Sequence, residues 1–104
     1  MTESEFLTLA ENCISQVENI FELAFERDEL DVECKRSGNV LEVEFVNNGS
    51  KIIINSQAPM QEMWMAAKSG GFHYKYDGAS WRNTRDQTEF FDTLTKLAKQ
   101  QAAA

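Results

Sequence analysis

The chain has 104 residues, 42% of them hydrophobic, and a formal net charge of −7, so it fits one domain with its own core, over residues 1–104. The negative charge excludes a protein that binds a nucleic-acid backbone, which needs clustered Lys and Arg. Because no apolar run approaches the roughly 20 residues of a membrane span and the first ten residues do not resemble a signal peptide, we expect a soluble, cytoplasmic protein without a membrane partner.

The first third of the chain carries all of the net negative charge. Residues 1–33 contain ten acidic residues and one basic residue, whereas residues 34–104 contain seven acidic and nine basic residues. Such asymmetry within one chain indicates a surface that meets a cation or a basic partner.

A long amphipathic helix is predicted at the N-terminus. Thr2 and Glu5 have the spacing of a capping box, so the helix should begin there. Apolar residues then recur at helical spacing and occupy about half of the helix circumference. They are Phe6, Leu9, Ala10, Cys13, Ile14, Val17, Ile20, Phe21, Ala24 and Phe25. The opposite side of the helix is acidic.

Seven carboxylates follow one another from the second half of this helix into the next strand, and we call them the acidic ridge. They are Glu18, Glu22, Glu26, Asp28, Glu29, Asp31 and Glu33. Like charges at i,i+4 spacing near a helix C-terminus cost stability. Two interpretations remain: a solvated surface that only confers solubility, or a binding surface.

Six short strands are predicted after the helix, because apolar and polar residues alternate between turn sequences rich in Gly and Asn. The strands lie at residues 30–35, 41–45, 50–55, 60–68, 72–76 and 79–83. Segment 60–68 has a helix-favouring composition, but the Ser69-Gly70-Gly71 turn limits it to about one strand's length, so we interpret it as a strand.

A second helix should close the chain, with Thr84 or Asp86 as its N-cap. Its apolar stripe consists of Phe90, Phe91, Leu94, Leu97 and Ala98. Since short connections require antiparallel neighbours, the predicted fold class is α+β: a two-layer sandwich of helix, five or six strands and helix. Both helices should cover one face of the antiparallel sheet and leave the other exposed.

No catalytic motif is present, so we do not expect an enzyme. Cys13 and Cys34 form no CxxC pair and are expected to be buried thiols, with a disulfide or a ligand role as the alternatives. Two cysteines are too few to hold an iron–sulfur cluster. His73 is either an ordinary strand residue or a ligand. Trp64 should lie on the open sheet face, either as a contact site or covered by a neighbour. The oxygen atoms of the acidic ridge suit hard cations, including iron, Mn²⁺, Ca²⁺ and lanthanides, bound weakly.

The central part of the chain resembles the frataxins, in particular their bacterial form. The resemblance rests on Asn-Gly-Ser-Lys-Ile-Ile-Ile-Asn-x-Gln-x-Pro at residues 48–59, then Trp64, Ala66, Gly70-Gly71-Phe72-His73, Asp77-Gly78 and Trp81. It extends over essentially the whole chain. It implies weak binding of Fe²⁺ and Fe³⁺ by the acidic ridge and a role in iron–sulfur cluster assembly, in contact with the cysteine desulfurase and its scaffold protein.

The family's functional residues carry over to matching positions of this chain. Glu18, Glu22, Glu29, Asp31 and Glu33 match the family's ridge positions, and the resemblance implies that the ridge binds metal; Glu26 and Asp28 are added from the residue pattern. We expect partners to be contacted by Glu18, Glu22, Asp31, Glu33, Asn55, Gln57 and Trp64. Our leading hypothesis is a non-enzymatic regulator of assembly, monomeric, with oligomers promoted by metal. The alternatives are an iron donor and a weak ferroxidase. Asn19, Leu23 and Phe25 interrupt the ridge, which lowers the expected number of bound iron ions.

Overall fold

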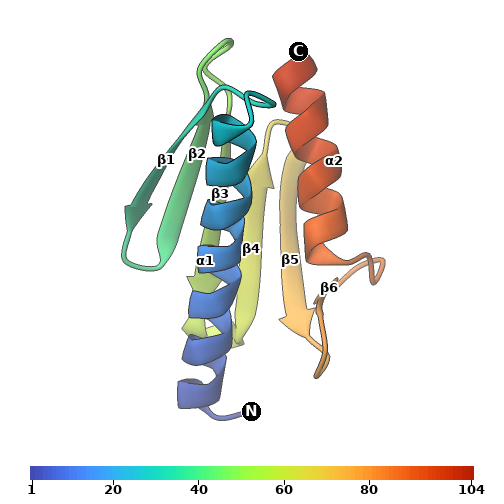
Figure 1. Ribbon diagram of the computed structural model, residues 1–104. Coiled ribbons are helices and arrows are strands. Elements are labelled where there is room, and N and C mark those ends of the chain that lie inside the picture. Colours follow the sequence, from blue (N-terminus) through green and yellow to red (C-terminus); the bar gives the residue numbers. More distant parts are fainter.

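The computed structural model describes residues 1–104 and has two layers, a six-stranded sheet and two helices (Figure 1). The elements are α1 (Glu3–Glu26), β1 (Val32–Ser37), β2 (Val40–Phe45), β3 (Lys51–Gln57), the 3₁₀ turn η1 (Ala58–Met60), β4 (Glu62–Ala67), β5 (Gly70–Tyr76), β6 (Trp81–Asn83) and α2 (Phe90–Ala103). The strands lie in chain order and every neighbouring pair is antiparallel. The predicted fold class is confirmed.

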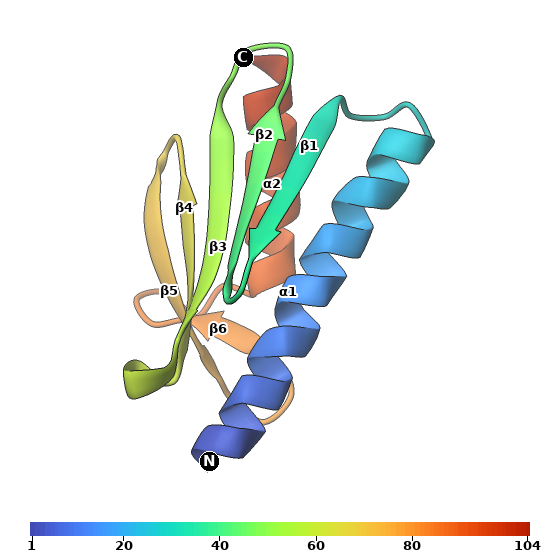
Figure 2. The ribbon, with the colours of Figure 1, turned by 90° about the vertical axis from the view of Figure 1, so that its left-hand side faces the viewer.

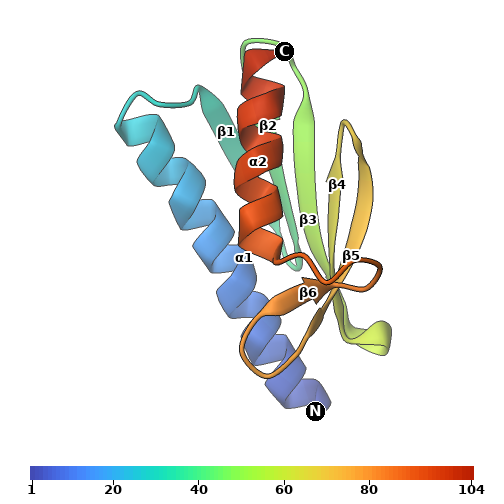
Figure 3. The ribbon, with the colours of Figure 1, turned by 90° about the vertical axis from the view of Figure 1, so that its right-hand side faces the viewer.

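Both helices lie on the same face of the sheet and run in the same direction, so the two termini lie at opposite ends of the molecule (Figures 2 and 3). Helix α1 crosses the sheet obliquely. Near its start Phe6 meets Trp81 of β6 edge to face, with ring centroids 6.0 Å apart, and near its end Phe21 meets Phe45 of β2 at 6.3 Å. Neither helix combines the length and the apolar composition that crossing a lipid bilayer requires.

The capping box starts α1 as predicted. Thr2 Oγ1 accepts from the Glu5 amide at 3.1 Å, and the Glu5 carboxylate accepts from the Thr2 amide at 3.1 Å. Two apolar residues of the predicted core face are instead exposed, Ile20 at 42% and Phe25 at 55%. They lie at opposite margins of the face, because a helix resting on a single sheet buries a narrower stripe than half of its circumference.

Alternation along the strands sends one set of side chains to the helices and the other to solvent. The inward set on β2 to β6 includes Leu41, Val43, Phe45, Ile52, Ile54, Met63, Met65, Tyr74 and Trp81, which are all buried. The predicted strand at 60–68 exists, but it begins at Glu62. Pro59 lies in the 3₁₀ turn before it, and Gln61 then takes a left-handed conformation with φ of 52°.

The second helix begins later than predicted: its N-cap is Glu89, not Thr84 or Asp86. The Glu89 carboxylate accepts from the Asp92 amide at 3.0 Å. Asp86 instead closes a turn by accepting from the amide and hydroxyl of Thr88. Arg82 and Glu89 form an isolated antiparallel bridge, so the chain makes a turn at residues 84–86 and comes back beside β6 before the helix begins.

Gln101 fastens the C-terminal end of α2 to the sheet, although its polar side chain is buried. Its Nε2 donates to Ser50 Oγ at 3.1 Å and to the Lys51 carbonyl at 3.2 Å, and its Oε1 accepts from the Lys68 amide at 2.9 Å. The side chain therefore satisfies backbone groups at the ends of both β3 and β4.

Replacing Gln101 with Ala should lower the free energy of unfolding by about 1–3 kcal/mol, because the Lys68 amide and the Lys51 carbonyl lose a buried partner. Urea denaturation measures the change. Gln100→Ala is the matched control: Gln100 is exposed, so its loss should change stability by less than about 0.5 kcal/mol. Equal effects of the two substitutions would contradict this role of Gln101.

Candidate functional site

The acidic ridge lies along the second half of α1, the loop at residues 27–31 and the start of β1. The loop joins α1 and β1 at one end of the molecule (Figure 2). Six of the seven carboxylates are exposed, and Glu18 is half-buried. The Glu33 side chain points away from the helical members of the ridge. Side chains alternate along β1, and since Val32 and Arg36 face α1, Glu33 projects from the opposite face of the sheet. The structure therefore groups the helical and loop acids and places Glu33 around the sheet edge.

The ridge supplies the donor atoms that hard cations prefer, but no closed cage. Nowhere do three or more His, Cys, Asp or Glu side chains come close enough together to hold a metal ion. Carboxylate oxygens suit iron and other hard cations, so the donor chemistry fits iron. Because no ligand set is preassembled, a cation would bind through one or two carboxylates and retain much of its water.

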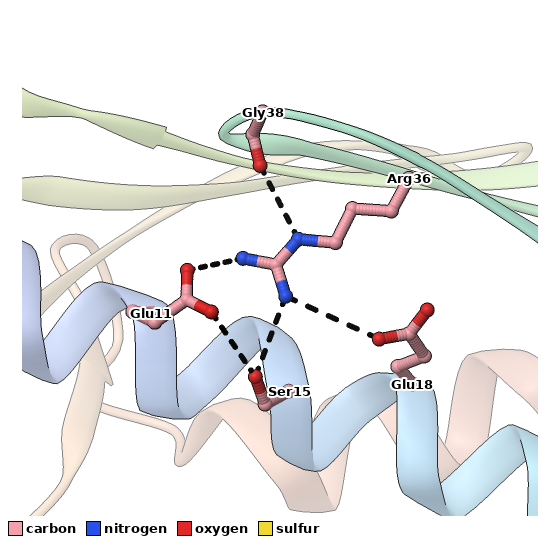
Figure 4. A network of polar contacts seen from close by, with 5 residues as sticks. All are labelled: Glu11, Ser15, Glu18, Arg36 and Gly38. Carbon is pink, nitrogen blue, oxygen red and sulfur yellow. Dashed lines mark hydrogen bonds and ion pairs between the residues drawn. The ribbon is translucent and has the colours of Figure 1, made fainter.

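Arg36 of β1 pairs with the first part of the acidic side of α1 (Figure 4). Its Nη2 forms an ion pair with Glu11, its Nη1 lies 3.3 Å from Ser15 Oγ and 4.0 Å from Glu18 Oε1, and its Nε donates to the Gly38 carbonyl at 3.2 Å. Glu18 thus has a counter-ion within the chain. The alternation of β1 could have predicted this pairing, because it puts Arg36 on the face of Val32.

The other members of the ridge have no such partner. Glu22, Glu26, Asp28, Glu29, Asp31 and Glu33 form neither an ion pair nor a side-chain hydrogen bond within the chain. Their charges are uncompensated and face solvent. They are therefore available to a cation or to Lys and Arg of a partner.

The two cysteines are poor candidates for metal ligands. Both are free; Cys13 is buried and Cys34 is half-buried. Burial raises the pKa of Cys34 to about 11, and the carboxylates of Glu18 and Glu22 add to that rise. Burial likewise raises the pKa of Cys13 to about 12, with a smaller effect of Glu89. At neutral pH both sulfur atoms are protonated, whereas a metal ligand must be the thiolate.

Trp64 is held in a fixed orientation on the open sheet face. Its ring stacks on His73, with ring centroids 4.3 Å apart and planes 6° from parallel. Its indole Nε1 donates to Glu62 Oε1 at 2.9 Å, and the same oxygen lies 3.5 Å from His73 Nδ1. Sequence reasoning missed Glu62, which is only 5% exposed, although a residue two positions before Trp64 must share its face.

The other predicted residues of the sheet surface adjoin this cluster. Asn55 pairs with Trp64 across β3 and β4, and Gln57 pairs with Glu62. Both Asn55 and Gln57 are half-buried. The open face thus presents an aromatic surface, formed by Trp64 and His73, beside two amide side chains.

Comparisons with known proteins find similarity over the whole chain. A family model described as a frataxin-like domain matches residues 1–104. The iron-sulfur cluster assembly protein CyaY of Herminiimonas arsenicoxydans is 60% identical over 101 residues, which cover 97% of this chain and 90% of that protein. The protein of the same name from Cupriavidus metallidurans is 51% identical over 102 residues, covering 98% and 91% of the two chains.

Solved structures have the same fold. A frataxin from Psychromonas ingrahamii, studied for stability within the CyaY family, superposes with a TM-score of 0.85 and 32% identity, covering 99% of this chain and 93% of its own. A trimeric frataxin from the yeast Saccharomyces cerevisiae, complexed with ferrous iron, has a TM-score of 0.74 and 22% identity, covering 91% and 86% of the two chains.

Removing an uncompensated charge from the ridge should stabilise the protein. In metal-free, low-salt buffer, Glu26→Gln should raise the melting temperature by about 1–3 °C, because it relieves repulsion at the C-terminal end of α1. Added divalent cation should stabilise the parent more than the variant. Both effects are measured by thermal denaturation followed by circular dichroism.

Glu18→Gln is the matched control, since it makes the same change of charge on the same helix. Glu18 has Arg36 as a counter-ion, so its replacement should not raise the melting temperature. A decrease for Glu26→Gln would mean that this carboxylate stabilises the fold.

Proposed function

The chain belongs to the frataxin-like family, and from this we propose that it is an iron-binding protein that regulates iron–sulfur cluster assembly. Family membership supplies the pathway, since relatives up to 60% identical are named as iron-sulfur cluster assembly proteins. The observation that carries the proposal is the set of six exposed, unpaired carboxylates at the junction of α1 and β1. A structural surface would pair such charges with bases.

The ridge binds iron weakly in this proposal. Its carboxylates are hard donors that accept Fe²⁺ and Fe³⁺, and they accept other divalent or trivalent cations as well, because no rigid cage selects the ion. Open, exposed ligation gives modest affinity. It also lets the metal exchange quickly.

The same surface docks a basic region of the cysteine desulfurase, and the open sheet face contacts the scaffold protein through Asn55, Gln57 and Trp64. Clustered carboxylates attract clustered Lys and Arg, and the attraction weakens with salt. A cation on the ridge reduces its negative charge and so changes the strength of docking. This competition links the supply of iron to the rate of assembly in the cytoplasm.

An iron donor is the second candidate, because open carboxylates release metal readily. The two functions differ in what the metal-free protein does: a regulator that acts by docking slows cluster formation without iron, whereas a donor has no effect without it. Ferroxidase activity has the least support, since no three acidic, Cys or His side chains converge on one position.

Charge reversal on the ridge should abolish docking. The variant Glu22→Lys/Asp31→Lys should bind the desulfurase at least about tenfold more weakly at low ionic strength, because attraction becomes repulsion. Isothermal titration calorimetry measures the affinity, and assays of cluster formation measure the loss of regulation.

The variant Glu3→Lys/Asp92→Lys is the control. It makes the same change of net charge at the first turns of the two helices, away from the ridge. Measured in the same low-salt buffer, it should bind the desulfurase at least about fivefold more tightly than the ridge variant, because its new charges lie far from the docking surface. Undiminished binding by the ridge variant at low salt would refute the docking surface.

Trp64→Ala should weaken binding to the scaffold protein by about tenfold or more, since it removes a preoriented aromatic contact of the kind that dominates interfaces. Lys35→Ala, on the same sheet face but at the β1 edge, should change that affinity by less than about twofold. Desulfurase affinity should be unchanged in both variants. An unaltered scaffold affinity for Trp64→Ala would exclude this contact.

A further inference from the structure

Arg36 occupies a position that is surrounded by oxygen atoms of α1 and of the turn after β1. We propose that this guanidinium acts as a built-in cation that excludes iron and partner cations from Glu11 and Glu18, so that binding on the acidic ridge begins at Glu22. This inference rests on the proposed function and identifies which part of the ridge performs it.

The geometry is that of an occupied cation site (Figure 4). The oxygen atoms come from the carboxylates of Glu11 and Glu18, from Ser15 Oγ and from the Gly38 carbonyl, and all of them face one guanidinium. Ser15 also donates to Glu11 Oε1 at 3.4 Å, which orients that carboxylate. Residues 11, 15 and 18 are spaced by four and three, so they share one side of the helix. These are hard oxygen donors of the kind that bind Ca²⁺, Mn²⁺ or iron.

Burial separates Arg36 and Glu18 from the rest of the acidic side. The Arg36 side chain is 21% exposed and that of Glu18 is 30% exposed. The Glu11 side chain is 60% exposed, but it is paired with Arg36, whereas the six remaining ridge residues are exposed and unpaired. A guanidinium that is engaged through its Nε and both Nη atoms is held in one orientation. The Arg36 charge is therefore committed to Glu11 and Glu18 and does not compensate the ridge as a whole.

The competition favours Arg36 because it is part of the chain. A free cation binds from solution, whereas the tethered guanidinium has an effective concentration set by the short distance between β1 and α1. A weakly held metal does not displace it. Lys and Arg of a docking partner likewise meet Glu22 and the residues beyond it.

Chemical-shift mapping with a redox-inert hard cation tests the inference. The ¹⁵N-labelled protein is titrated with Lu³⁺, and amide shifts show where the cation binds. In the parent, shifts should be confined to residues 22–33. In Arg36→Gln they should extend to Glu11, Ser15 and Glu18, with an overall affinity about twofold to fivefold higher because one nearby positive charge is gone.

Lys35→Gln is the matched control. It removes the same charge from the neighbouring position, but Lys35 is exposed, points to the other sheet face and pairs with no acid. Its map should match that of the parent. Adding Glu11→Gln to the Arg36→Gln variant should remove the shifts at Ser15, because the new site loses a carboxylate.

Arg36→Lys keeps the positive charge and is the substitute test variant if Arg36→Gln does not fold. An ammonium group cannot reach all of these oxygens at once, so shifts at Ser15 should appear in part. Identical maps for the Arg36 variants and Lys35→Gln would overturn the inference, and so would shifts at Glu11 and Glu18 in the parent. If Lu³⁺ causes no shift on the acidic ridge of the parent, metal binding by the ridge itself is refuted. That outcome is distinct from a failure of the inference about Arg36.

Discussion

The burial of one face of α1 against the sheet determines where everything else in the molecule lies. Phe6 and Phe21 hold the helix against β6 and β2, and a helix fixed along one face has its other sides fixed as well. The acidic side must then run along the edge strand β1. The short loop to that strand adds further carboxylates at the same end. Hydrophobic packing thus creates one acidic surface that extends over α1 and β1. Its charges belong to the residues that do not face the core.

Stability and binding oppose one another on this surface. Six carboxylates without counter-ions repel each other, and the helical ones lie where the helix dipole disfavours them. The chain tolerates this because a core of 20 buried hydrophobic residues lies beneath. Compensation is confined to Arg36, which neutralises the part of α1 nearest the middle of the helix. Local repulsion is kept where a cation or a basic partner could relieve it, as expected of a surface selected for binding.

Sequence patterns predicted those features of the fold that depend on local chemistry. The capping box at Thr2 was sufficient to predict where α1 begins. The alternation of apolar and polar residues along the strands was sufficient to predict the two layers of the sandwich. The later N-cap was not predictable, because Asp is a preferred N-cap residue and Glu is not. Local chemistry therefore favours Asp86, whereas in the structure Asp86 is engaged with Thr88 in a turn and Glu89 caps the helix. The partners of Arg36 and Gln101 lie on other elements, and spacing along one element carries no information about such contacts. The seven members of the acidic ridge were named from charge alone, which needs no knowledge of contacts, but the pairing of Glu18 with Arg36 was missed. That the ridge binds metal stays a prediction.

The protonated state of Cys34 has a further consequence for a surface proposed to hold ferrous iron. Ferrous iron in air generates peroxide and radicals, and peroxide attacks thiolates far faster than thiols. Burial raises the pKa of Cys34 to about 11 and keeps its proton in place, and the carboxylates of Glu18 and Glu22 add to that effect. Burial is thus the main protection of this sulfur atom from oxidation, because a cation bound at Glu22 would cancel the contribution of that carboxylate.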